Sequence, residues 1–153
     1  MKKFVAVLLA AMLCLSFAAC GGEKATDKTV DAAAMFKTLL TDVTYTDNAT
    51  ELDSSMAGVL LGGELPEGTE AHLAANDSAY LRCAVFACKD KDAAAAVKKL
   101  IQTYIDDSID AKYNVDEVAL LQNAKIHSMG NYVAVAVTSD IDNVNKVIDQ
   151  YFA

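Results

Sequence analysis

The chain has 153 residues, of which 54% are hydrophobic, and its formal net charge is −8. This length is enough for one domain with a core of its own and hardly enough for two. The acidic balance argues against nucleic acid and against anionic lipid head groups as partners, because like charges repel.

The first 19 residues have the order of a secretory signal. Lys2 and Lys3 give a positive start, residues 4–15 form an apolar run, and two alanines precede Cys20. The run is shorter than the roughly 20 residues that a membrane-spanning helix needs. We therefore expect residues 1–19 to be a signal peptide that is removed, and a permanent transmembrane anchor is the weaker alternative.

The ending SFAAC at residues 16–20 resembles the lipobox of bacterial lipoproteins. In these proteins the cysteine thiol receives a diacylglycerol and becomes the first residue after cleavage. Phe17 stands where leucine is more usual, and ordinary cleavage with Cys20 as a bystander is the alternative. We expect lipidation at Cys20, which makes the membrane a partner through the lipid anchor and places the exported protein on the outer face of the cell membrane.

Residues 20–29 are small, polar and aperiodic, which predicts a flexible linker after the lipidated cysteine. The remainder, residues 30–153, is expected to form a single α+β domain. Apolar residues recur at helical intervals from 30 to 43, with Asp31 as the cap. Residues 48–60 indicate a second short helix, and residues 61–70 a loop.

Two strands are expected at residues 71–75 and 79–88. An amphipathic helix of about five turns follows within residues 90–113, with its apolar side chains on one face. Residues 123–139 predict a hairpin around Gly130 and Asn131, because period-two alternation runs away from this turn on both sides. Asp140 is then expected to cap a closing helix.

This order of elements predicts an α+β fold, with an antiparallel or mixed sheet of about four strands and helices packed mainly on one face. Counting outward from the hairpin turn pairs Met129 with Tyr132 and Ile126 with Val135. One face of the sheet is expected to form the core. The other face, expected to be open, carries the candidate binding residues Tyr80, Arg82, Phe86, His127 and Tyr132.

An arginine among aromatic side chains can stack and donate hydrogen bonds, as it does at many protein interfaces. We therefore expect a non-catalytic module that binds an envelope protein or a small ligand through the open face. The competing interpretation is that a helix or loop covers this face, or that it is solvated with scattered aromatics. A third possibility is an assembly or spacing role without any ligand. The oligomeric state stays open.

No motif predicts catalysis, a metal or a cofactor, and no catalytic residue is assigned. His72 and His127 are the only histidines, and spacing gives neither a nucleophile, an orienting carboxylate nor a metal. A small extracytoplasmic enzyme with His127 as its base remains the alternative to a binding module. Cys83 and Cys88 stand roughly 16 Å apart in one expected strand, too far for a disulfide, so they are interpreted as buried thiols.

Several stretches together support a resemblance: the lipobox, VFACKDKDAAAAVKKLI at residues 85–101, and AKIHSMGNYVAVAVTSDIDNVNKVI at residues 124–148. They resemble the small lipoprotein family known as domain of unknown function 4358, found mainly in Gram-positive anaerobes. The resemblance spans residues 30–152 and implies export, lipid anchoring and an α+β fold, without implying an activity. Cys83 stands where members of this family usually carry an aliphatic residue.

Overall fold

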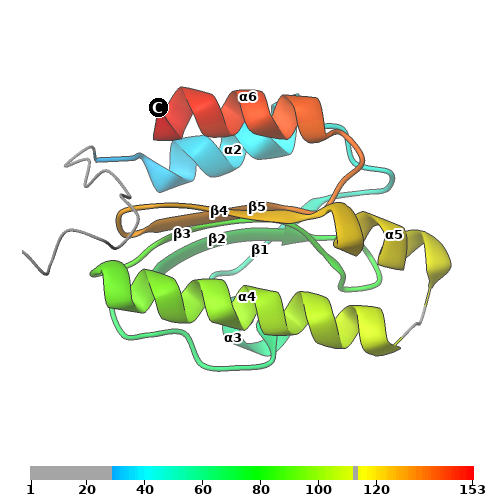
Figure 1. Cartoon of the computed structure of the whole chain (residues 1–153), viewed down its shortest axis with the longest axis horizontal. Helices are drawn as coiled ribbons and strands as arrows, with labels where there is room; N and C mark the ends of the chain where they lie inside the picture. The colour runs from blue at the N-terminus through cyan, green and yellow to red at the C-terminus, as the bar shows by residue number, and fades with distance from the viewer. Residues whose placement is uncertain (1–28, 112–113) are drawn as a thin grey trace, which may run out of the picture.

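The computed structural model describes residues 29–111 and 114–153 of the chain. These residues form an open, five-stranded antiparallel sheet that lies between two layers of helices (Figure 1). The expected signal peptide, the lipidation site Cys20 and linker residues 20–28 lie outside the described residues. The predicted α+β fold is confirmed.

The strands of the sheet lie in the order β1-β2-β3-β5-β4, and every neighbouring pair is antiparallel. Their bounds are β1 (Thr50–Leu52), β2 (Glu70–Ala75), β3 (Leu81–Ala87), β4 (Lys125–Met129) and β5 (Tyr132–Ala136). The expected hairpin is confirmed, since Met129 pairs with Tyr132 and Ile126 with Val135. The fifth strand, β1, was not predicted, because its three residues fall inside the segment that the sequence assigns to a short helix.

Five helices are described, namely α2 (Ala32–Asp42), α3 (Met56–Leu61), α4 (Lys91–Ala111), α5 (Val115–Asn123) and α6 (Ile141–Phe152). Asp31 caps α2 as predicted, since its Oδ1 accepts a hydrogen bond from the backbone N–H of Ala34 at 2.9 Å. Asp140 precedes α6 but makes no such bond to the helix backbone. Its carboxylate instead accepts from the Thr44 N–H and the Asn143 amide, which joins α6 to the segment after α2.

The helices cover both faces of the sheet, which corrects the prediction that they pack mainly on one face. Helices α2 and α6 lie together on one side, and α3 and α4 on the other (Figure 1). Six of the seven β3 residues are buried, so this central strand offers an apolar surface to both layers. Burying a large apolar side chain stabilises the fold by about 1.5–3 kcal/mol relative to exposure. Packing against β3 is therefore favourable for both layers of helices.

Each layer of helices has its own core. On the α4 side, Val97 and Ile101 belong to the cluster that contains Phe86 and Val133 of the sheet. On the α2–α6 side, the core is formed by Phe36, Leu39, Val144 and Val147 together with the sheet residues Cys83, Val85 and Ala134. Helix α5 lies at one end of the sheet and leads into β4 (Figure 1). Among the described residues, none of the helices combines the length and apolar character required to cross a membrane.

The register between β2 and β3 shifts at one point. Ala75 pairs with Leu81 and Ala74 pairs with Cys83, which leaves Arg82 as an extra residue in β3. An extra residue reverses the alternation of side chains beyond it. Leu81 therefore belongs to the α4-side core and Cys83 to the opposite core, although simple alternation places both on one face.

Candidate functional site

The predicted open face is covered in the structure. Arg82 is 1% exposed, Phe86 is fully buried and Tyr132 is 9% exposed. Tyr132 lies in the α2–α6 core, whereas Phe86 pairs with Val133 and lies in the α4-side core. The five residues therefore do not share one face, and Tyr80 and His127 are only partly exposed. This corrects the expectation of an open, aromatic binding face.

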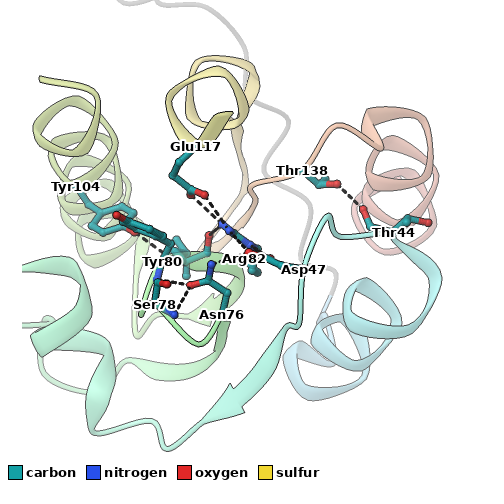
Figure 2. Close-up of polar contacts among 10 residues, drawn as sticks. Thr44, Asp47, Asn76, Ser78, Tyr80, Arg82, Tyr104, Glu117 and Thr138 are labelled. Carbon is teal, nitrogen blue, oxygen red and sulfur yellow. Dashed lines mark hydrogen bonds and ion pairs between the residues drawn. The ribbon is translucent and has the colours of Figure 1, made fainter. Parts of the chain in front are cut away.

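Arg82 is the centre of a buried ionic network at one end of the sheet (Figure 2). Its guanidinium donates to Asp47 from Nε at 2.6 Å and from Nη2 at 2.9 Å. On the other side, Nη1 and Nη2 donate to the two carboxylate oxygens of Glu117, each at 2.8 Å. Nη1 also donates to the Leu81 carbonyl at 3.2 Å. A guanidinium has five N–H donors, so all of its donor capacity is used within the protein.

Asp47 is the more exposed partner of Arg82, and Asn76 supports it. The Asn76 amide donates to Asp47 Oδ2 at 2.7 Å, while Asn76 Oδ1 accepts from the Ser78 and Tyr80 backbone N–H groups (Figure 2). The hydrogen bonds from Arg82 lower the pKa of Asp47 to about 2, although partial burial opposes this. Burial alone would lower the pKa of Arg82, but the two carboxylates raise it above its ordinary value.

The network joins three segments that are distant in the sequence. Asp47 comes from the connection between α2 and β1, Arg82 from β3, and Glu117 from α5. Glu117 is 7% exposed, so its charge depends on Arg82 for compensation. Because no guanidinium donor remains for a ligand, we assign Arg82 a structural role, in place of the recognition role expected from the sequence.

His127 lies on the edge strand β4, opposite Ala134. Burial lowers its pKa, with a further contribution from Lys125, and Asp149 acts in the opposite direction. Within residues 29–111 and 114–153, no hydroxyl, thiol or carboxylate forms a hydrogen bond with this imidazole. The structure thus brings no nucleophile to His127 in the part of the chain that it describes.

The two cysteines of the domain are free and buried, as predicted. Burial raises the pKa of Cys83 to about 11, and contact with the Tyr45 hydroxyl partly offsets this. Burial also raises the pKa of Cys88, against an opposing contact from Thr69. No group of three or more histidine, cysteine or acidic side chains that could hold a metal ion occurs in the described ranges.

A cavity of about 460 Å³ lies where β1 stops short of the end of β2. The six residues of β2 all pair with β3, but β1 pairs only with Leu73, Ala74 and Ala75. Residues 70–72 therefore have no strand beside them on the β1 side. We call this cavity the β2 notch, and it is lined by Glu51, Leu52, Asp53, Ser54, Ser55, Leu65, Thr69, Glu70, Ala71 and His72.

The notch exists because the chain leaves the sheet at Asp53. The Asp53 carboxylate accepts a hydrogen bond from the Ser55 N–H at 2.9 Å. Hydrogen bonding from the Ser55 side chain, and then from this N–H, lowers the pKa of Asp53. The Asp53 carbonyl accepts from the Met56 N–H at 2.9 Å. These bonds turn the backbone into α3 and end β1 after three residues, since a side chain that bonds its own backbone favours a turn over a strand.

His72 and Glu70 form the polar wall of the notch. His72 Nε2 and Glu70 Oε1 are 2.8 Å apart, and the imidazole stacks on Phe36 of α2 with ring centroids 5.9 Å apart. From the sequence, His72 was considered only as a catalyst, and its place in a cavity was not predicted. The alternation of polar and apolar residues in EAHLAA at residues 70–75 indicated a strand. Nothing in that stretch showed that the neighbouring strand β1 would be only three residues long.

Comparison with known proteins gives one match. Residues 70–138 match the family model described as "Domain of unknown function (DUF4358)". The matched segment runs from β2 through β5 and contains Arg82, Glu117 and the β2 wall of the notch, whereas Asp47 and β1 precede it. No curated protein and no solved structure matches the chain.

Proposed function

We propose that the chain, whose residues 70–138 match this family, is a lipid-anchored, extracytoplasmic binding module of the Gram-positive cell envelope. In this proposal it holds a partner in the β2 notch without converting it. The observation that carries the proposal is the notch itself. Its volume of about 460 Å³ falls within the roughly 300–1,000 Å³ of typical ligand sites. It combines an apolar floor with a few polar groups, as binding sites commonly do.

The anchoring part of the proposal rests on the first 20 residues of the sequence. A positive start, an apolar run of about a dozen residues and the ending SFAAC are the features of a lipoprotein signal. A diacylglycerol on Cys20, with the polar linker behind it, would tether the domain to the outer face of the membrane. The acidic domain is then held near the membrane surface without a basic patch of its own.

The binding part of the proposal rests on the groups in the notch. The Glu70–His72 pair, the Glu51 carboxylate and the free edge of β2 can all form hydrogen bonds with a ligand. Leu52, Leu65 and Ala71 add apolar contacts beside them. Such a set recognises a ligand by shape and hydrogen bonding, and it needs no covalent step.

Site-specific photocrosslinking in intact cells of the native host tests this function. A photoreactive residue is placed at position 51, on the rim of the notch, or at position 142, which is exposed on α6. We expect one defined adduct from position 51 in the membrane fraction and no matching adduct from position 142. Identical adduct patterns at both positions, or none from position 51, would contradict a binding role for the notch.

A further inference from the structure

We propose that the β2 notch binds an extended, cationic peptide segment of a partner protein, which adds to the sheet beside residues 70–72 of β2. This inference rests on the proposed function and adds the class of ligand. The bound segment would take the place that a longer β1 would occupy. It would pair with β2 through backbone hydrogen bonds, as in other cases of strand addition.

The unpaired edge of β2 is the first argument. In an antiparallel ladder, successive residues direct their backbone N–H and C=O groups to alternate sides of the strand. Because only β3 lies beside residues 70–72, part of their backbone groups points into the notch. An exposed strand edge of this kind is a template for another extended chain. Three residues of extended chain cover about 10 Å, which matches the missing length of β1.

The side chains around the notch alternate in a way that fits an extended peptide. Consecutive residues of β2 line the same cavity, which is possible only if the cavity lies at the edge of the sheet and reaches both of its faces. On the α4 side the lining is apolar, formed by Leu52, Leu65 and Ala71. On the α2 side it is polar, formed by Glu51, Glu70 and His72, since Glu51 pairs with Ala74 and shares the face of residues 70 and 72.

Charge decides which peptide fits. The carboxylates of Glu51, Asp53 and Glu70 line the notch, and His72 is the only basic side chain among its lining residues. The whole chain carries a formal charge of −8, so its long-range field also attracts a cationic partner. An extended segment in which apolar residues alternate with lysine or arginine would place its apolar side chains against Leu52 and Leu65. Its basic side chains would then meet Glu51 and Glu70.

The test uses the peptide Val-Lys-Val-Lys-Val-amide, labelled with fluorescein at its N-terminal amine through a flexible spacer, and the full chain in detergent micelles. Fluorescence anisotropy is the readout. Two comparison peptides separate the contributions of charge and backbone. The first replaces both lysines by glutamate. The second keeps the lysines but carries N-methyl groups on the amides of one edge, so that it cannot donate hydrogen bonds to β2. We expect saturable binding of the parent lysine peptide, and binding weaker by about tenfold or more for both comparison peptides.

Matched variants locate the binding on the protein. The double variant Glu51→Gln/Glu70→Gln removes two charges from the notch, and Asp107→Asn/Asp110→Asn removes two from exposed positions on α4. We expect the first variant to bind the lysine peptide about three- to tenfold more weakly and the second to change the affinity less than twofold. Equal weakening in both variants would overturn the inference, because the attraction would then be that of the whole acidic surface.

The peptide test and the crosslinking test fail independently. If the N-methylated peptide binds as tightly as its parent, or if no peptide binds, the strand-addition inference is wrong. An adduct from position 51 in cells would leave the binding role intact in that case. If the peptide binds in micelles and no adduct forms from position 51, the notch recognises such peptides but the proposed role in the envelope is wrong.

Discussion

The two carboxylate oxygens of Glu117 accept parallel hydrogen bonds from Nη1 and Nη2 of Arg82, both at 2.8 Å, although both side chains are buried. Glu117 lies in α5 and Arg82 in β3, so this bidentate pair fixes a helix to the end of the sheet. Removal of Arg82 would leave Glu117 as an uncompensated buried charge, whereas Arg82 would keep Asp47 as a partner if Glu117 were removed. The pair therefore makes α5 depend on Arg82 for its position.

Replacing the arginine alone should be strongly destabilising. We expect Arg82→Met to lower the free energy of unfolding by about 3–5 kcal/mol, because Glu117 would stay buried without a counter-ion. The double variant Arg82→Met/Glu117→Leu should lose less, since it leaves no buried charge and Asp47 is 41% exposed to water. Urea unfolding followed by circular dichroism gives both values. Equal losses in the two variants would show that the ion pair does not hold α5 in this way.

The Asp47 carboxylate predicts a pH dependence of stability. Its pKa is about 2 in the folded protein, below the ordinary value of 3.8, chiefly because Arg82 donates hydrogen bonds to it. Its contribution is therefore fully present above about pH 4 and is lost as the pH falls to 2. We expect wild-type protein to lose more unfolding free energy between pH 4 and pH 2 than Asp47→Asn, as measured by urea titration at each pH. Parallel pH profiles for the two proteins would contradict this assignment.

His127 predicts a second pH range, separate from that of Asp47, in which the stability of the protein changes. Burial lowers its pKa below the ordinary value of 6.5, so the folded state binds a proton less readily than the unfolded state. Stability should therefore be highest above pH 6.5 and should fall as the pH drops below it. The His127→Gln variant should show a flatter profile between pH 7 and pH 5. NMR titration of the imidazole checks the direction, and a pKa above 6.5 would contradict it.

The thiols of the domain should be unreactive while it is folded. Burial raises the pKa of Cys83 to about 11 and also raises that of Cys88, so little thiolate forms at neutral pH. We expect slow reaction of the native protein with a thiol-specific disulfide reagent at pH 8, and fast reaction of two thiols in guanidinium chloride. Fast labelling of either cysteine in the native state would show that its side chain is more accessible than the structure indicates.

The positions of the local elements were easier to predict from the sequence than the face of the sheet on which each side chain lies. The hairpin register followed from Gly130 and Asn131, and the cap of α2 from Asp31, because both signals are local. Phe86 was placed on the wrong face relative to Tyr132 because both faces of β3 are buried, so its side chains do not alternate between apolar and polar. The pairing of Phe86 with Val133, which decides the face, is a long-range contact.

The candidate site was harder to foresee for a related reason. Arg82 was recognised as unusual, but its partners Asp47 and Glu117 are each 35 residues away and carry no motif. The extra residue at position 82 is likewise a property of two strands together. The notch depends on the early end of β1, where the Asp53 carboxylate bonds the next turn. A short edge strand of three residues is too weak a pattern to predict from one sequence.

A lipid at Cys20 is the first requirement of the proposed function, because a module that is not anchored cannot hold a partner at the membrane. Metabolic labelling of the native host with a palmitate analogue tests this directly, with Cys20→Ser as the control. We predict a labelled protein that sediments with membranes, and loss of both label and sedimentation in the variant. Wild-type protein that stays unlabelled and accumulates in the culture fluid would contradict lipid anchoring at Cys20 and the envelope function that depends on it.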